Sequence, residues 1–413
     1  MSRYNYRNNT AGALDSDHIY YNINYTDPES GSAADISGNV IELTTNNKEL
    51  VFNFNQTRAA PYLQCPEDYY LSVLRFTIES PNLPVFTVQP IQGGAPSQTI
   101  YTVTIMGTNN IPYKKAVEWV PQDYTQGIPA TPVANVPTSP ADPYYYCYSY
   151  SYFVECINKA LDYIWVTNLS GTTGEGPYLY YDASKYLFTL GGPVSAFRTK
   201  LNGDILGLYN IYFNVPLLNL MSSLPAKYVA GEVTVVSSDN KQMDYKMILS
   251  TGTDSLATTQ PYVSNIRVNP ITSDIDVYST QEYSTIPLWT PITAIVFKTS
   301  LLTTNPEIMG TPVVYANNNQ NINGGKQNAD ILNILTEHYA PLITGTEYKP
   351  FIFYEPTGEF KLTDLYGKNP LSDIDISVFW RDNYGNLIPF KLGIGCSATI
   401  KILFRKKTFN SDK

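Results

Sequence analysis

Short β-favouring segments, separated by stretches rich in turn residues, constrain the fold of this 413-residue chain more than any other feature. Within residues 69–79, Leu74, Phe76 and Ile78 alternate with polar side chains, as in a strand that buries one face. Similar candidate strands cover residues 40–43, 50–54, 99–106, 232–236, 244–248, 292–298, 311–315, 351–354, 360–363, 374–380 and 398–404. Short strands with long connections and little helix predict an all-β fold, an antiparallel sandwich.

One segment has clear helical periodicity. Between residues 150 and 165 the apolar side chains recur at the spacing of one helix face, at Phe153, Val154, Ile157, Ala160, Leu161 and Ile164. Ser151 is the expected N-cap, and Gly171 lies beyond the expected end. The pattern predicts one amphipathic helix that packs on a sheet. A second, short helix is expected between Pro216 and Leu224.

The N-terminal segment differs from the rest of the chain. Residues 1–36 are polar, rich in Tyr, Asn, Ser and Gly, and without periodicity, which predicts an extended arm outside the core. Its tyrosines favour a strap that orders on a neighbouring subunit over a solvated tail. Residues 37–413 are expected to form the folded domain, with a loop across the six prolines of residues 121–143.

The composition indicates a surface for protein contacts. Lys and Arg number 27 and Asp and Glu number 36, and the resulting formal charge of −9 argues against a mainly nucleic-acid-binding surface. Charged residues make up only 15% of the chain, whereas tyrosine is abundant at 35 residues. Tyr supplies large contact area at low entropic cost. No apolar stretch approaches the ~18 residues of a membrane span, and the N-terminus lacks the apolar core of a signal peptide.

The sequence contains no catalytic motif of the G-x-S-x-G, H-E-x-x-H or G-x-x-x-x-G-K-[ST] type. Its two histidines, His18 and His338, leave little scope for histidine catalysis or zinc binding. The four cysteines are scattered and are expected to act as small buried apolar residues, at Cys65, Cys147, Cys156 and Cys396. We therefore expect no enzyme activity, no metal and no cofactor.

Two carboxylate pairs have the spacing of neighbours on one face of a strand. They are Asp274 with Asp276 and Asp373 with Asp375, each within a Ser-Asp-Ile-Asp segment. Such a pair would suit a calcium ion or the acid and base of a glycosidase. The simpler interpretation, which we favour, is the start of a strand with solvated acids.

A basic cluster lies at the C-terminal end of the last predicted strand. Its members are Lys401, Arg405, Lys406 and Lys407. One interpretation is contact with an acidic neighbour or with enclosed nucleic acid through phosphate groups. The other, which we favour, is a charged end that keeps a sheet edge soluble.

The C-terminal segments resemble a known family. Residues 371–390 (LSDIDISVFWRDNYGNLIPF) and 395–407 (GCSATIKILFRKK) are similar to the C-terminal end of the penton, or minor capsid, proteins of virophages, polinton-like viruses and related elements. Residues 148–161, 211–220 and 289–300 resemble further segments of this family. The motif residues that carry the resemblance are Asp373, Asp375, Trp380, Gly385, Lys401, Phe404 and Arg405.

The resemblance implies a single jelly roll in residues 37–413, with a loop insertion somewhere within residues 107–290. It also implies a homopentamer at the fivefold vertices of an icosahedral shell, and therefore a location in the virion. The implied partners are further copies of this chain and trimers of a double jelly-roll major capsid protein. Packaged nucleic acid and other minor capsid proteins are additional candidate partners.

Two other functions are compatible with the residues. A receptor- or glycan-binding fibre module would use aromatic platforms, for which the candidates are Trp119, Trp165, Trp289 and Trp380. A glycosidase on a β-sandwich would use the carboxylate pairs, and is the least favoured alternative. Core packing is the commoner role of a tryptophan, and we expect it for Trp380 inside a strand.

Overall fold

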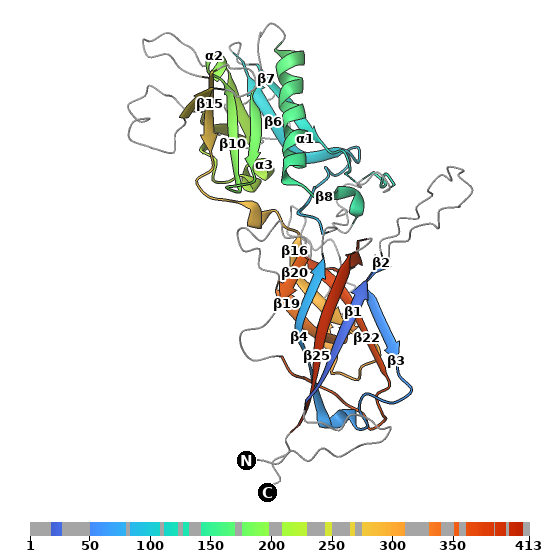
Figure 1. The fold of residues 1–413 in the computed structure, drawn as a ribbon. Coiled ribbons are helices and arrows are strands. Elements are labelled where there is room, and N and C mark those ends of the chain that lie inside the picture. Colours follow the sequence, from blue (N-terminus) through green and yellow to red (C-terminus); the bar gives the residue numbers. More distant parts are fainter. Residues whose placement is uncertain are drawn as a thin grey trace, which may run out of the picture. The chain divides into compact units, whose positions relative to one another are not determined.

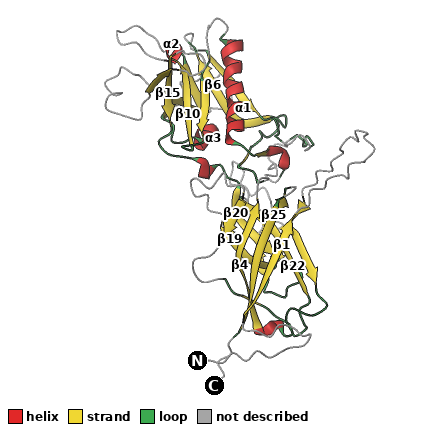
Figure 2. Cartoon of the chain, viewed as in Figure 1, coloured by secondary structure: helices red, strands yellow, loops and turns green. Residues whose placement is uncertain are grey.

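The computed structural model describes residues 18–26, 50–79, 83–107, 111–122, 127–131, 142–169, 176–197, 209–228, 244–249, 265–268, 275–309, 330–339, 351–354, 361–383, 385–393 and 396–407. This part of the chain consists mainly of strands (Figures 1 and 2). The chain divides into two compact units. Unit 1 is formed by Met1–Leu83, Ile292–Pro341 and Tyr348–Lys413, and unit 2 by Pro84–Pro291 and Leu342–Glu347.

In its described residues, unit 1 is built from strands and one 3-10 turn, η1 (Pro66–Asp68). The strands are β1 (His18–Thr26), β2 (Leu50–Val51), β3 (Asn53–Thr57), β4 (Tyr69–Glu79), β16 (Ile292–Lys298), β17 (Glu307–Met309), β18 (Asp330–Leu332), β19 (Ile334–Tyr339), β20 (Phe351–Tyr354), β21 (Thr363–Asp364), β22 (Asp373–Asp382), β23 (Leu387–Pro389), β24 (Lys391–Leu392) and β25 (Ser397–Lys406). One sheet has the order β1-β25-β4-β20, with β21 also on β4. The other has the order β19-β16-β22-β23, with β3 also on β22. The remaining strands form the pairs β2–β24 and β17–β18.

Unit 1 has the topology of a jelly roll. Its eight main strands in chain order are β1, β3, β4, β16, β19, β20, β22 and β25. One sheet then has the order first-eighth-third-sixth, and the other has the order fifth-fourth-seventh-second. All these pairings are antiparallel, and strands from both ends of the chain interleave in both sheets, as in a jelly roll. The predicted fold class is therefore confirmed.

The jelly-roll core lies between the two sheets, where the rings of Phe76 and Phe297 are 4.9 Å apart. Strand β4 departs from the predicted alternation at Leu74, which is half-buried. A register shift between Lys401 and Ile402 of β25 leaves Leu74 without a partner in the pairing. Such a β-bulge reverses the facing of the residues beyond it, so Val73 takes the buried place.

Strand β1 corrects the predicted arm. Residues 18–26 pair with β25 along their whole length, and Ile19 and Ile23 are buried. The arm prediction is therefore wrong for this segment, and its other residues, 1–17 and 27–36, lie outside the described residues. The alternation was concealed because the outward positions carry Tyr20, Asn22 and Asn24, whose composition resembles that of a solvated tail.

Unit 2 contains two further sheets and most of the helical residues. Its elements are β5 (Phe86–Thr87), β6 (Gln98–Met106), β7 (Pro112–Glu118), η2 (Pro143–Tyr145), β8 (Tyr146–Cys147), α1 (Tyr150–Tyr163), η3 (Ile164–Asn168), β9 (Tyr178–Asp182), β10 (Leu187–Pro193), α2 (Val194–Phe197), β11 (Asn210–Asn214), α3 (Val215–Leu220), β12 (Ala226–Tyr228), β13 (Asp244–Met247), β14 (Asn265–Val268), β15 (Ile275–Thr280) and η4 (Ile286–Leu288). The sheet orders are β12-β13-β11-β6-β7 and β14-β15-β10-β9, with β5 and β8 forming a separate pair.

Helix α1 confirms the predicted amphipathic helix. All six predicted core-facing residues are buried, although the N-cap is Ser149 and not Ser151. The helix packs beside the edge strands β7 and β9. Its Asn158 side chain accepts a hydrogen bond from Leu179 N (2.7 Å) and donates one to Leu179 O (2.8 Å). The amide takes the place of a neighbouring strand at this position, because it satisfies both backbone polar groups of Leu179 on the edge strand β9.

The main segment of unit 2, Pro84–Pro291, lies between β4 and β16 in chain order and begins earlier than the insertion predicted within residues 107–290. The difference arises because β6 looks like any other buried strand in sequence, although it joins a sheet of unit 2. The prediction of one folded domain over residues 37–413 is replaced by two units. Three candidate strands, at residues 40–43, 232–236 and 311–315, lie outside the described part of the chain.

The burial of β1 leads to a stability prediction. Ile23 is 1% exposed, so Ile23→Ala should lower the free energy of unfolding by about 2–5 kcal/mol. Asn24→Ala is the matched control, because Asn24 is exposed on the same strand, and it should change stability by less than about 0.5 kcal/mol. Urea denaturation measures both values. Equal stability of the two variants would contradict the placement of β1 in the core.

Candidate functional site

The family-like motif residues lie on strands β22 and β25 of unit 1, except Gly385, which lies in the turn after β22. Asp375 makes the most polar contacts among them. Asp375 is 5% exposed, and its carboxylate binds the loop that follows β16. Ser300 donates to Oδ2 from its backbone N (2.6 Å) and from its Oγ (2.7 Å). Leu301 N donates to Oδ1 (2.9 Å), and the Thr299 hydroxyl donates to the same oxygen. The carboxylate therefore holds residues 299–301 against β22.

The hydrogen bonds of Asp375 outweigh its burial. Burial alone would raise the pKa of this carboxyl, because desolvation penalises the charged form. The hydroxyl groups of Ser300 and Thr299 and the backbone N–H groups of Ser300 and Leu301 donate to the ionised form and lower the pKa below its ordinary value. The expectation of a solvated acid at this position is therefore wrong.

The other motif residues of β22 and its turn also have structural contacts. Asp373 accepts a hydrogen bond from the Thr57 hydroxyl of β3. Trp380 is buried, as expected for a ring inside a strand. Gly385 has a φ of 87°, which favours glycine, and its N–H donates to Asp382 O (3.1 Å) in the turn between β22 and β23.

The members of the predicted basic cluster differ in their contacts. Lys401 Nζ lies 4.9 Å from the ring centroid of Tyr20 on the neighbouring strand β1. Arg405 is exposed, Lys406 is partly exposed, and Phe404 between Arg405 and the strand interior is fully buried.

Lys407 belongs to the fold and not to a free basic surface. Its Nζ pairs with Asp364 Oδ1 (2.8 Å) and lies 5.1 Å from the ring centroid of Tyr70. Its backbone N–H donates to Asp68 O (2.7 Å). These contacts join the end of β25 to the segments around β4 and β21.

The described ranges contain no group of metal-ligating side chains and no membrane-spanning helix. Among these residues no three His, Cys, Asp or Glu side chains are grouped to hold a metal ion, and no helix is long and apolar enough to cross a membrane. Asp274 and the side chains of Asp276 and His338 lie outside what the structure describes. Cys147 and Cys156 are buried as predicted, whereas Cys65 is exposed, which contradicts its predicted burial.

Sequence reasoning missed the partners of Asp375. Thr299 and Ser300 stand in a segment that resembles the family, but nothing in the sequence indicates a contact with a residue 75 positions away. A Thr-Ser pair directly after a strand is typical of a turn that is stabilised by side-chain hydrogen bonds. This signal predicts the loop but does not identify Asp375 as its partner. Tyr20 was missed because β1 was assigned to the arm.

Sequence comparisons relate the chain to proteins of a virophage. The family model of the Sputnik minor capsid protein V18/19 matches residues 19–406. The chain is 33% identical over 116 residues to "Uncharacterized protein V18" of Sputnik virophage, covering 26% of this chain and 68% of that protein. It is 30% identical over 131 residues to "Structural protein V19" of the same virophage, covering 32% of this chain and 56% of that protein.

Two solved structures share the fold. A chain of the Sputnik virophage structure determined by cryo-EM matches with a TM-score of 0.73 and 22% identity, over 95% of this chain and 99% of that chain. The mavirus penton protein crystal structure matches with a TM-score of 0.58 and 15% identity, over 94% of this chain and 99% of that chain.

The contacts of Asp375 lead to a pH-dependent prediction. Asp375→Asn should lower the free energy of unfolding at pH 7 by about 1–3 kcal/mol, because an amide nitrogen would face hydrogen-bond donors. Because the pKa of Asp375 is lowered in the folded protein, the natural protein should have its full stability advantage over Asp375→Asn above the unfolded-state pKa of about 3.9. This advantage should disappear as the pH falls through the lowered native pKa. Urea denaturation across this pH range measures the difference.

The matched control is Asp373→Asn, two positions away on the same strand. Asp373 is partly exposed and accepts a side-chain hydrogen bond from the Thr57 hydroxyl, so its replacement should cost less than about 1 kcal/mol. Equal losses for the two variants, or a difference that does not change with pH, would contradict the role assigned to the Asp375 carboxylate.

Proposed function

We propose that this chain, which belongs to the family of the Sputnik minor capsid protein V18/19, forms homopentamers at the fivefold vertices of an icosahedral shell. Membership of a structural capsid family gives the chain a structural role in the virion and confirms that it is not an enzyme. The assignment to the vertex is supported by the fold that it shares over 94% of its length with a penton protein. The glycosidase alternative is therefore abandoned.

The jelly roll offers two flanks for a closed ring. A fivefold ring of identical subunits needs a heterologous interface, in which one surface patch meets a different patch of the next copy. In the sheet β1-β25-β4-β20, β1 and β20 lie at opposite ends. Each exposes a large aromatic side chain, Tyr20 at 56% and Phe353 at 57%. We assign these two edges to the subunit interface.

The other partners follow from the proposed position. A vertex subunit must also contact the surrounding shell, and major capsid proteins, by resemblance trimers of a double jelly roll, are the proposed neighbours. Residues 1–17, which precede β1, are proposed as a strap between neighbouring subunits. Lys401 and Lys407 contact other residues of the jelly roll. We therefore favour a structural role for the basic cluster over contact with packaged nucleic acid.

Oligomeric state tests the proposed ring. Sedimentation velocity at high protein concentration should give a species of about 230 kDa, five copies of the 46.2 kDa chain, and negative-stain images should show fivefold rings. Tyr20→Glu or Phe353→Glu should dissociate the ring, because each places a charge in the proposed interface. Tyr228→Glu, at an exposed tyrosine of unit 2, is the control and should leave the ring intact. Trimers, or a natural protein that stays monomeric, would contradict the proposal.

Deletion of residues 1–17 tests the proposed strap. The truncated chain keeps all of β1 and should fold with unchanged stability, but should enter assembling shells less efficiently. Deletion of residues 1–26 is the comparison, because it removes β1 from the sheet and should destabilise the fold. Thermal unfolding and the protein content of purified particles measure the two effects. Normal incorporation of the chain that lacks residues 1–17 would rule out the strap.

A further inference from the structure

The outer face of one sheet in unit 2 carries an ordered set of aromatic and hydroxyl side chains. In the strands β9, β10 and β15, the inward residues belong to the core of unit 2, and they are Leu179, Tyr181, Phe188, Leu190 and Val277. The residues between them face outward. Cross-strand register places Tyr178, Gly191 and Tyr278 in one row. It places Tyr180, Thr189 and Thr280 in the next row.

The first row depends on a glycine. A Cβ atom on Gly191 would lie 2.8 Å from Tyr178 Cζ and 2.9 Å from its hydroxyl oxygen. The far end of the Tyr178 ring therefore lies over Gly191, across the neighbouring strand and along the surface of the sheet. Tyr180, two residues further along β9, is 49% exposed. Tyrosine rings are thus presented on a rigid sheet and not on a loop.

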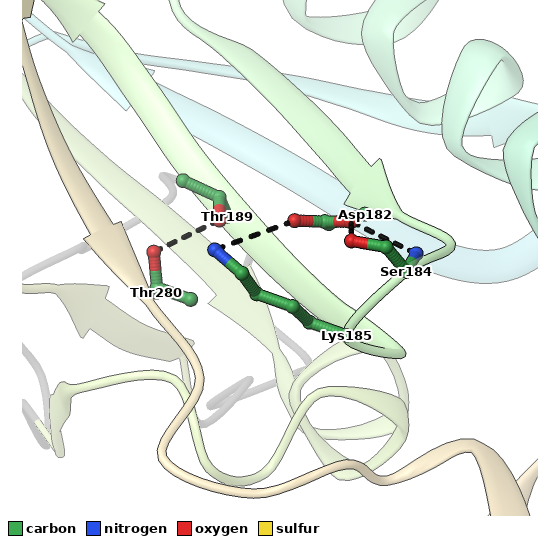
Figure 3. A network of polar contacts seen from close by, with 5 residues as sticks. All are labelled: Asp182, Ser184, Lys185, Thr189 and Thr280. Atoms are coloured by element: carbon green, nitrogen blue, oxygen red, sulfur yellow. Dashed lines mark hydrogen bonds and ion pairs between the residues drawn. The ribbon is translucent and has the colours of Figure 1, made fainter. Parts of the chain in front are cut away.

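Polar side chains lie in register with these rings and at the end of β9. Figure 3 shows these polar side chains, Asp182, Ser184, Lys185, Thr189 and Thr280. The hydroxyls of Thr189 and Thr280 lie 2.9 Å apart. At the end of β9, Asp182 accepts hydrogen bonds from Ser184 N (2.9 Å) and Ser184 Oγ (2.6 Å). Lys185 Nζ lies 3.7 Å from Asp182 Oδ2. Thr189 is only 6% exposed, so the polar side chains that a ligand can reach beside the rings are those of Thr280, Ser184 and Lys185.

We infer that the outer face of β9, β10 and β15 is a binding site for an uncharged saccharide. Sugar rings have apolar C–H faces that stack on aromatic rings, and hydroxyl groups that need donors and acceptors beside those rings. This face supplies both. It is assigned to neither the jelly roll nor the proposed subunit interface, and the inference goes beyond the proposed vertex function.

The charges favour a neutral ligand. The charged side chains that the structure describes on this face are Asp182 and Lys185, and their ion pair leaves no net charge. The whole chain carries a formal charge of −9, which disfavours polyanions such as nucleic acid or sulfated glycans at long range. Each single site would be shallow and weak, and several copies on one assembly would raise the effective affinity through multivalency.

Titration of the full chain with defined tetrasaccharides tests the inference. The probes are cellotetraose and mannotetraose as neutral sugars and a heparin tetrasaccharide as an anionic one, followed by saturation-transfer NMR. We expect at least one neutral probe to half-saturate the protein at about 0.1–10 mM, and heparin not to bind. Tyr180→Ala should weaken binding about tenfold through the loss of a ring.

Two more variants define the site. Gly191→Ala should also weaken binding, because the new methyl group would collide with the Tyr178 ring, and the whole ring must then rotate away from its place over the sheet. Tyr228→Ala is the control: Tyr228 is 44% exposed in the other sheet of unit 2, and its loss should leave binding unchanged. Thermal unfolding checks that each variant folds.

Three results would overturn the inference. They are binding of neither neutral probe at about 10 mM, binding of heparin alone, and equal losses from Tyr180→Ala and Tyr228→Ala. Sugar binding and ring formation are measured separately, so the failure of either proposal is distinguishable from the failure of the other. Tyr180→Ala should in particular leave the oligomeric state unchanged.

Discussion

The pairing of the first and last described strands is the constraint on which unit 1 depends. Strand β25 lies between β1 and β4 and is paired to both, so the two ends of the described chain are held in one sheet. This pairing closes the jelly roll, because β25 has no other way to satisfy the backbone groups of its two edges. It also brings Lys401 to Tyr20 and carries Lys407 to Asp364.

The jelly roll of unit 1 can accommodate unit 2 as an insertion, because each unit has its own core. The chain leaves unit 1 after β4 and returns at β16, and unit 2 has its own aromatic core. In that core Trp289 stacks on Phe188 at 5.0 Å, and its Nε1 donates to Leu220 O (2.7 Å). A unit with a separate core can change its outer surface without cost to the capsid-forming jelly roll. The separate cores suit the proposal that unit 1 forms the subunit contacts and that unit 2 binds a ligand.

Elements that are defined by a local residue pattern were predictable from the sequence, whereas contacts between distant segments were not. Helix α1 and strand β25 were predicted because their apolar periodicity is contained within a short window. Strand β1 was missed because the polar-looking Tyr21 stands between the inward-facing Ile19 and Ile23, and because its partner lies at the other end of the chain. The role of Asp375 was missed for the same reason, since its donors follow β16. The resemblance of the C-terminal segments to a family supplied the jelly roll, which periodicity alone leaves as an unspecified sandwich.

The position of this chain in the assembled particle is the most direct test of the central claim. A cryo-EM reconstruction of shells that contain the protein should show five copies of unit 1 around each fivefold axis, with β1 of one copy facing β20 of the next. Density for the chain at other positions in the shell, with the vertices occupied by a different protein, would contradict the account.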